Sequence, residues 1–151
     1  MAEYLMGIDA GTGSVRVALF DFRGQNRAYA VAEYGTTYPK NGWAEQSDYE
    51  WFEALKKAIP ECIKKAGIAA DNIAAITCDA TTNTLVYLDE NDTSVRPPIL
   101  WMDVRATEEA SFIDTIREEY DATKFYKPGF RADTMVPKCM CCLLYTSPSP
   151  R

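Results

Sequence analysis

A short stretch near the N-terminus carries groups suited to holding an anion. An apolar run ends at Asp9, a turn with glycines at positions 11 and 13 follows, and a second apolar run contains Arg16. Glycines let the backbone come close to a phosphate, and successive N–H groups can surround an anion. Asp9 cannot bind phosphate directly, but it suits the Mg²⁺ that accompanies nucleotide phosphates. The candidate phosphate-binding residues are Gly11, Thr12, Gly13, Ser14 and Arg16, and the candidate metal ligand is Asp9.

Two better-known phosphate loops do not fit this turn. A dinucleotide-binding fingerprint needs a third glycine where Arg16 stands, and it leads into a helix, whereas an apolar strand is expected here. A P-loop needs a lysine before its Ser or Thr, and the turn contains no lysine. A plain glycine hairpin without a ligand remains the alternative.

Composition excludes several classes of protein. The 151 residues include 16 Lys and Arg against 22 Asp and Glu, a net charge of −6, which disfavours a nucleic-acid binder. No apolar run approaches the roughly 18 residues of a membrane helix, and the N-terminus lacks signal-peptide character, so a cytoplasmic protein is expected. The absence of histidine excludes Ser-His-Asp and Cys-His catalysis and any zinc site that uses histidine.

Hydrophobic patterning predicts a three-stranded antiparallel meander followed by a helix. Apolar runs at 4–9, 15–20 and 27–34 are separated by short turns that contain glycine. Ser47 and Glu50 form a plausible capping box, and Gly67 marks the end of the helix. We expect Pro60 to kink this helix. The expected apolar face consists of Trp51, Leu55, Ile59, Cys62 and Ala66.

The second half of the chain predicts further strands and another helix. We expect strands at 73–78 and 84–88, a short apolar segment at 99–101, and a helix with apolar positions from Ala106 to Tyr120. The resulting order, β-β-β-α-β-β-β-α, indicates an α/β fold with a mixed sheet.

The last residues do not continue this pattern. Residues 142–151 resemble one reading frame of a sequencing-library adaptor. We therefore divide the chain into a native part at 1–140 and a non-native tail at 141–151. The tail also explains why Cys139, Cys141 and Cys142 crowd together, although a thiolate metal or redox cluster is the alternative.

Several segments together resemble the FGGY carbohydrate kinases, two-domain sugar and polyol kinases of the actin-like ATPase superfamily. Residues 7–14, the apolar strand after them and Asp21 resemble the first phosphate motif of that family. The segment Trp-Met-Asp-Val-Arg-Ala at 101–106 strongly resembles ribulokinase-like members. Other segments that match in order are 42–46, the Trp51 helix, 76–82, 96–100 and 136–138. The resemblance covers about residues 4–140 and implies a truncated N-terminal subdomain of the ribonuclease H-like, actin-like ATPase fold.

The resemblance implies an ATP-dependent, Mg²⁺-dependent kinase that phosphorylates a sugar or polyol hydroxyl. Asp9 would position Mg²⁺, while Thr12, Gly13 and Ser14 would face the phosphates and Arg16 could neutralise developing charge. The implied sugar contacts are Asp79, Ala80, Thr81, Trp101 and Asp103. The family's catalytic base and adenine site are expected beyond this chain, so no catalytic residue is assigned and the 151-residue fragment is expected to be inactive.

The residues at 79–82 bear on the choice of sugar. Asp-Ala-Thr-Thr stands where xylulokinases usually carry Gln-Met-His and glycerol kinases Gln-Arg-Glu, which favours a ketopentose such as ribulose. Structural alternatives remain: Asp79 as a strand-end cap, Trp101 as core packing, and Asp103 paired with Arg105. The expected partner is a small sugar, with neither nucleic acid nor membrane, and a homodimer of the full-length protein is left open. Alternative functions are an FGGY kinase of the polyol or autoinducer type, or a small non-catalytic α/β binding module.

Overall fold

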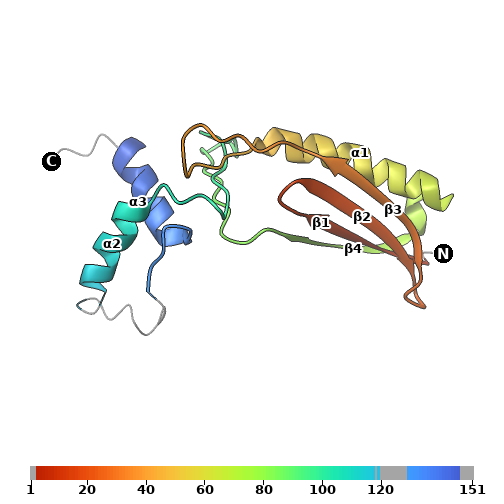
Figure 1. Cartoon of the computed structure of the whole chain (residues 1–151). Coiled ribbons are helices and arrows are strands. Elements are labelled where there is room, and N and C mark those ends of the chain that lie inside the picture. The colour runs from red at the N-terminus through yellow and green to blue at the C-terminus, as the bar shows by residue number, and fades with distance from the viewer. Residues whose placement is uncertain (1–2, 118, 120–128, 147–151) are drawn as a thin grey trace. The chain divides into compact units, whose positions relative to one another are not determined.

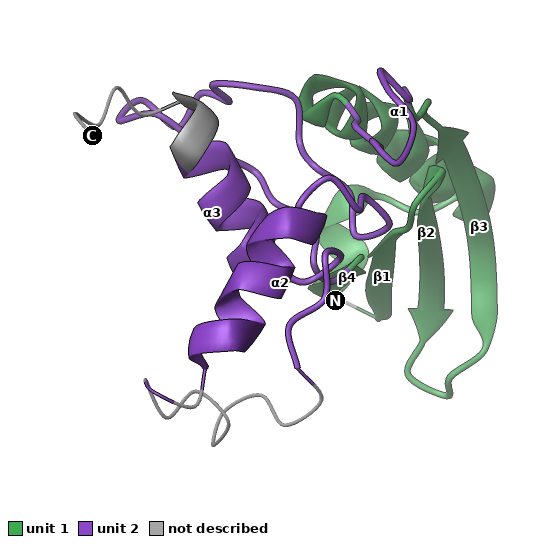
Figure 2. Cartoon of the chain, turned by 60° about the vertical axis from the view of Figure 1, so that its left-hand side comes forward, with its two compact units in different colours: residues 1–36, 47–81 green, residues 37–46, 82–151 purple. Residues whose placement is uncertain are grey.

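Strand β1 (Tyr4–Ala10) lies between two partners of opposite direction in a four-stranded sheet of order β3-β2-β1-β4. The computed structural model describes residues 3–117, 119 and 129–146 (Figure 1). It divides into two compact units: residues 1–36 with 47–81, and residues 37–46 with 82–151 (Figure 2). The sheet belongs entirely to the first unit, and each unit is described by itself.

The sheet is mixed, as the sequence predicts. Strands β2 (Ser14–Asp21) and β3 (Asn26–Glu33) continue from β1 as an antiparallel meander. Strand β4 (Ile73–Ala80), which follows the short 3₁₀ helix η1 (Ala70–Asn72), pairs with β1 in parallel. The tight turn between β2 and β3 uses Gly24 at φ +79°, a conformation that glycine adopts without strain.

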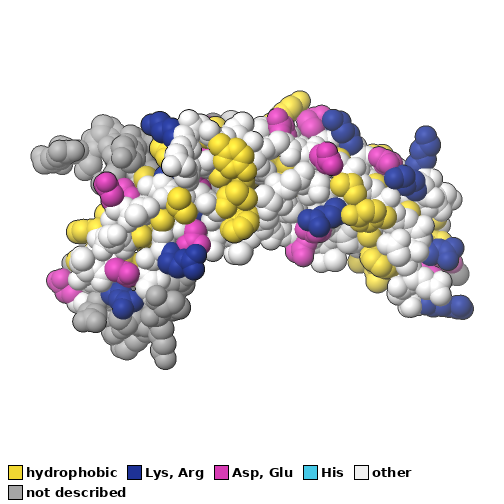
Figure 3. Space-filling view, in the orientation of Figure 1, with side chains coloured by type: hydrophobic (Ala, Val, Ile, Leu, Met, Phe, Trp, Pro, Cys, Tyr) yellow, Lys and Arg dark blue, Asp and Glu magenta, His cyan; other side chains and the backbone are white. Residues whose placement is uncertain are grey.

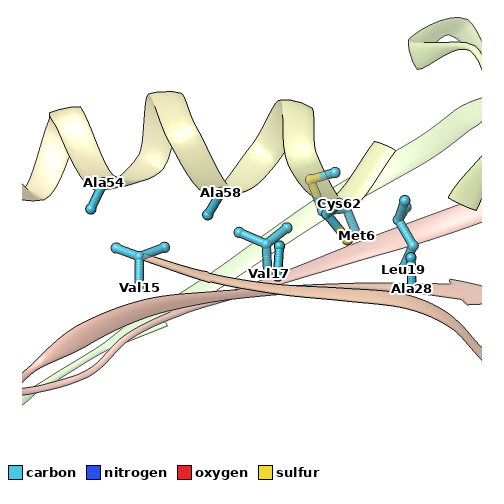
Figure 4. Close-up of a cluster of buried hydrophobic side chains, with 9 residues drawn as sticks. Met6, Val15, Val17, Leu19, Ala28, Ala54, Ala58 and Cys62 are labelled. Atoms are coloured by element: carbon cyan, nitrogen blue, oxygen red, sulfur yellow. The ribbon is translucent and has the colours of Figure 1, made fainter. Parts of the chain in front are cut away.

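Helix α1 (Asp48–Ala66) covers one face of the meander. Alternate residues of the strands point toward it, because successive side chains of a strand face opposite sides. Small side chains on α1 allow the helix to approach the sheet closely (Figure 4). The buried cluster consists of Met6, Val15, Val17, Leu19, Ala28, Ala30, Ala54, Ala58 and Cys62.

The ends of α1 agree only in part with the expectation. The helix ends at Gly67, which adopts the left-handed conformation at φ 67°, and it continues through Pro60. The predicted capping box is wrong: the Ser47 side chain makes no capping hydrogen bond. The Glu50 carboxylate instead accepts a hydrogen bond from the backbone N–H of Gly35 at 3.3 Å. Glu50 thus links the helix to the segment after β3.

The second unit contains two helices and irregular backbone. Helix α2 (Thr107–Ile116) is shorter than expected, and Tyr120 lies outside the described residues. Helix α3 (Met135–Thr146) contains the segment 136–138 and also includes residues of the adaptor-like tail. The origin of that tail stays a prediction.

The predicted strand at 84–88 is wrong, and 99–101 does not form a strand. Leu85 and Ile99 make one isolated antiparallel bridge, with both N–H to O distances at 2.9 Å. Pro97 and Pro98 precede Ile99 and have no backbone N–H, so the ladder cannot extend in that direction. These segments therefore form bridged loops outside the sheet.

Strand β4 is an exposed edge of the first unit. Residues 74–80 are exposed, including Ile76 at 60%. Apolar side chains are visible among charged ones on the face in Figure 3. Over the described part of the chain, no helix combines the length and apolar character that crossing a membrane requires.

The α1–sheet contact predicts the effect of enlarging Ala58, which is fully buried. Ala58→Leu in the full-length protein should cost about 1–3 kcal/mol, because an overpacked core forces strained side chains. Thermal unfolding should show a lower midpoint. The control is Lys57→Leu at the neighbouring exposed position, which should change stability by less than about 0.5 kcal/mol. Equal midpoints for the two variants would contradict this packing.

Candidate functional site

The register of β1 brings three predicted site residues together. Asp9 is the Cα partner of Arg16 on β2 and of Asp79 on β4. Paired residues on neighbouring strands lie on the same face of a sheet. These side chains line an open depression of about 360 Å³ together with Gly7, Ala18, Tyr29 and Thr77. The depression thus combines two carboxylates with one guanidinium.

Arg16 closes over the glycine turn. Its Nε lies 3.1 Å from Oδ2 of Asp9, with both side chains nearly half exposed. A Cβ atom at Gly11 would meet the Arg16 guanidinium, so the Arg16 side chain would have to move aside for any other residue there. An exposed ion pair contributes only about 0–1 kcal/mol, so either partner can exchange it for a ligand at little cost.

The turn itself presents its backbone to open space. Gly11 N–H donates to the carbonyl of Ser14 at 3.0 Å, which closes the hairpin at the first residue of β2. Gly13 is exposed, and a Cβ atom there would meet nothing within 4 Å. Thr12 lies between the two glycines. The backbone at Gly13 is therefore accessible to a phosphate-sized group.

Tyr34 holds this turn from the end of β3, a role that the sequence analysis missed. Its hydroxyl donates to the Gly11 carbonyl, and its backbone N–H donates to the Gly13 carbonyl at 3.1 Å. Burial, reinforced by the Asp9 carboxylate, raises the pKa of Tyr34 above its usual value. The hydroxyl therefore stays protonated and remains a donor. The Gly-containing turn alone could not reveal a contact from 23 residues away.

The predicted sugar-contacting segment begins at the end of β4. Asp79 and Ala80 are exposed, and Thr81 is partly exposed. The Thr81 N–H donates to the carbonyl of Ala10 at 3.3 Å, which extends the parallel pairing by one residue. Asp79 thus lies near the end of the pairing with β1, and Thr81 continues that pairing past the end of β4.

The other predicted sugar contacts belong to the second unit. Trp101 is 42% exposed, so much of its indole is open to solvent. An aromatic face of this kind can stack against the C–H face of a sugar. This exposure does not favour the alternative interpretation of Trp101 as a core residue.

Asp103 has a different environment and is fully buried. Its Oδ2 accepts hydrogen bonds from the Ala44 N–H and from Nη2 of Arg105, both at 2.7 Å. Burial opposes ionisation of Asp103, but the bonds from Arg105 and Ala44 hold the pKa of its carboxyl below the usual value. Direct contact of Asp103 with a sugar stays a prediction, which this geometry does not favour.

Arg105 joins Asp103 to a second acid. Its Nη2 also lies 2.7 Å from Oε1 of Glu45, and Arg96 reaches the same oxygen at 3.0 Å. The guanidinium of Arg105 stacks over the ring of Trp43 at 3.8 Å. The network connects the segment at 43–45 to the segment that follows Trp101.

The cysteines do not support the thiolate-cluster alternative. All five are free, and the described part of the chain contains no group of three or more Cys, Asp or Glu arranged to hold a metal.

Comparisons with known proteins agree with this arrangement. A sequence profile described as the FGGY family of carbohydrate kinases, N-terminal domain, matches residues 4–139. A glycerol kinase of Rhizobium meliloti (strain 1021) is 32% identical over 135 residues, which are 88% of this chain and 27% of the relative. A xylulose kinase of Staphylococcus epidermidis is 34% identical over 118 residues, 78% of this chain and 24% of the relative. The chain thus spans about a quarter of the length of these relatives.

Solved structures show the same fold. A xyloylose kinase from Brucella ovis superposes with a TM-score of 0.81 at 26% identity, covering 92% of this chain and 29% of that one. Plasmodium falciparum glycerol kinase with ADP superposes with a TM-score of 0.80 at 19% identity, covering 96% of this chain and 29% of that one. At this low identity, the similarity supports the fold and nothing more. The expected α/β fold with a mixed sheet, of the actin-like ATPase type, is confirmed.

The Tyr34 contact predicts a local effect of removing one hydroxyl. Tyr34→Phe should destabilise the protein by about 0.5–1.5 kcal/mol, because the Gly11 carbonyl loses its donor. Hydrogen exchange at residues 11–14 should become faster. Tyr49→Phe removes a hydroxyl from a side chain that is 68% exposed and serves as the control. Unchanged exchange in Tyr34→Phe would mean that this hydroxyl does not hold the turn.

Proposed function

The chain belongs to the FGGY family of carbohydrate kinases, and we propose that the full-length protein transfers the γ-phosphoryl group of ATP to a hydroxyl of a small sugar. The observation that carries the proposal is the placement of Asp9 beside the accessible Gly11–Ser14 turn. The proposal concerns the full-length protein, because this chain spans only about a quarter of its relatives. The general base is expected outside this chain.

The turn fits the phosphates of ATP. The open space over Gly13 leaves room for a phosphate oxygen, and Thr12 and Ser14 add hydroxyl donors. Arg16 offers a guanidinium beside the same turn, where it can neutralise charge on the phosphates. Phosphoryl transfer depends mainly on such positioning and charge stabilisation.

Asp9 is the proposed ligand of Mg²⁺. Carboxylate oxygens are ligands that this hard cation prefers. The Asp9 carboxylate lines the depression, and its side chain is nearly half exposed beside Arg16, so the carboxylate is accessible. When bound, the metal would supply charge neutralisation at the phosphates, and Asp9 would hold it in register with the turn.

The proposed sugar contacts are Asp79 and Ala80 at the end of β4, Thr81 directly after it, and Trp101 in the second unit. Exposed polar and backbone groups of the first segment can bond sugar hydroxyls, while the Trp101 indole can cover an apolar sugar face. The carboxylate of Asp103 already accepts hydrogen bonds from Ala44 and Arg105. Asp103 is therefore proposed to act together with Arg105 by orienting the backbone that carries Trp101.

We propose a ketopentose such as ribulose as the substrate. The support is Asp79 with its small and hydroxyl-bearing neighbours, which differ from the motifs usual in xylulokinases and glycerol kinases. Glycerol and xylulose kinases are nevertheless among the relatives at 31–34% identity, so a polyol kinase is the second candidate.

The metal assignment predicts the effect of Asp9→Asn in the full-length enzyme. Loss of the carboxylate charge should lower kcat by about two orders of magnitude or more, because the Mg²⁺–phosphate group loses its alignment. Asp71→Asn, at an exposed position in η1, is the matched control and should leave kcat unchanged. A near wild-type kcat for Asp9→Asn would reject the assignment of Asp9.

The substrate proposal predicts an order of preference. With Mg-ATP in excess, kcat/KM should be higher for ribulose than for xylulose or glycerol, because the 79–82 segment lacks the groups expected for those two substrates. A panel of pentuloses and polyols, measured with coupled ADP release, checks this order. A clear preference for glycerol would refute the ketopentose and favour the second candidate.

A further inference from the structure

Lys138 in α3 is charged and yet has no exposed surface. Fully buried lysines are rare unless the ammonium is paired, because the charge loses its hydration. Neither the phosphate turn nor the predicted sugar contacts include this residue. Its burial therefore requires an explanation within the second unit.

The ammonium of Lys138 bonds three backbone carbonyls. Its Nζ donates to the carbonyl oxygen of Leu100 at 2.7 Å, of Trp101 at 3.1 Å and of Asn83 at 3.3 Å. An ammonium has three donors, so this geometry uses all of them. Burial lowers the pKa of Lys138, while the Asp103 and Asp133 carboxylates oppose that effect. The bonds therefore compensate a costly burial.

The three carbonyls lie at or next to residues that the sequence analysis predicts to contact the sugar. Trp101 carries the exposed indole, and Asn83 directly follows the 79–82 segment. Asn83 adopts a left-handed conformation at φ 57°, which is uncommon outside glycine and must be held by its surroundings. The bond from Lys138 to the Asn83 carbonyl contributes to holding it.

The backbone of Lys138 also makes a hydrogen bond outside its helix. The Tyr87 hydroxyl donates to the backbone carbonyl of Lys138 at 3.3 Å. Together with the three bonds of the ammonium, this bond joins α3 to the loops at 83–87 and 100–101. Hydrogen bonds of this kind can fix the position of the loop backbone although Lys138 itself contacts no ligand.

We propose that Lys138 is a positioning residue for the sugar: its ammonium fixes the backbone of Trp101 and Asn83, and thereby the indole face and the loop that meet the substrate. This inference rests on the proposed kinase function. Lys138 itself contacts no phosphate in this account. Its loss should therefore weaken sugar binding selectively.

The test compares KM for the sugar and KM for ATP in the full-length enzyme. Lys138→Met, which keeps an unbranched side chain only one atom shorter and removes its donors, should raise the KM for the preferred pentulose about tenfold and change the KM for ATP less than about twofold. Lys138→Gln keeps an N–H donor and should show a smaller increase in sugar KM. Lys64→Met, at an exposed position of α1, is the control and should change neither KM.

The outcomes separate the two claims. A wild-type enzyme that phosphorylates no sugar or polyol rejects the proposed function, and the role of Lys138 falls with it. With an active wild type, an unchanged sugar KM in Lys138→Met, or an equal rise of both KM values, overturns the positioning role. If Lys138→Met yields no soluble protein, Lys138→Gln decides: a selective rise in sugar KM supports the proposal, and its absence overturns it.

Discussion

The register of β1 is the constraint on which the candidate phosphate site depends. Because β1 pairs antiparallel with β2 and parallel with β4, Asp9 lies between Arg16 and Asp79. A slip of one residue would turn Asp9 toward α1 and expose the apolar residues that now face the helix. The packing of Met6, Val15 and Val17 against α1 thus determines where the polar groups can meet. The pairing register of β1 therefore determines both the packing of the core and the position of the polar residues of the site.

In the second unit, where the described residues form no sheet, buried charged side chains hold the loops in place. Asp103 and the ammonium of Lys138 are fully buried, and each is bonded to backbone from a distant segment. Asp103 also forms a buried ion pair with Arg105 at 2.7 Å, and removing one partner of such a pair leaves an uncompensated charge, which commonly costs about 3–5 kcal/mol. These bonds fix irregular loops that lack the repeating hydrogen bonds of a strand. The exposed Trp101 is carried on backbone held in this way.

Local patterns were sufficient to predict the meander, α1 and its end at Gly67, because hydrophobic periodicity and turn-forming residues depend only on residues close together in the sequence. The strand expected at 84–88 was wrong because its partner segment begins with Pro97 and Pro98, which cannot extend a ladder. The role of Tyr34 depends on a contact with Gly11 across the sheet, which no spacing rule reveals. Asp103 could be selected as a polar residue beside Trp101, but its burial follows from long-range bonds to Ala44.

The central claim is that the full-length protein moves a phosphoryl group from ATP to a sugar hydroxyl. Phosphorus-31 NMR of the full-length protein with Mg-ATP and ribulose tests it directly. The account predicts that the γ-phosphate signal disappears as a sugar phosphate monoester and ADP appear in equal amounts. Release of inorganic phosphate alone, or no change in the ATP signals with any pentulose or polyol, would contradict it.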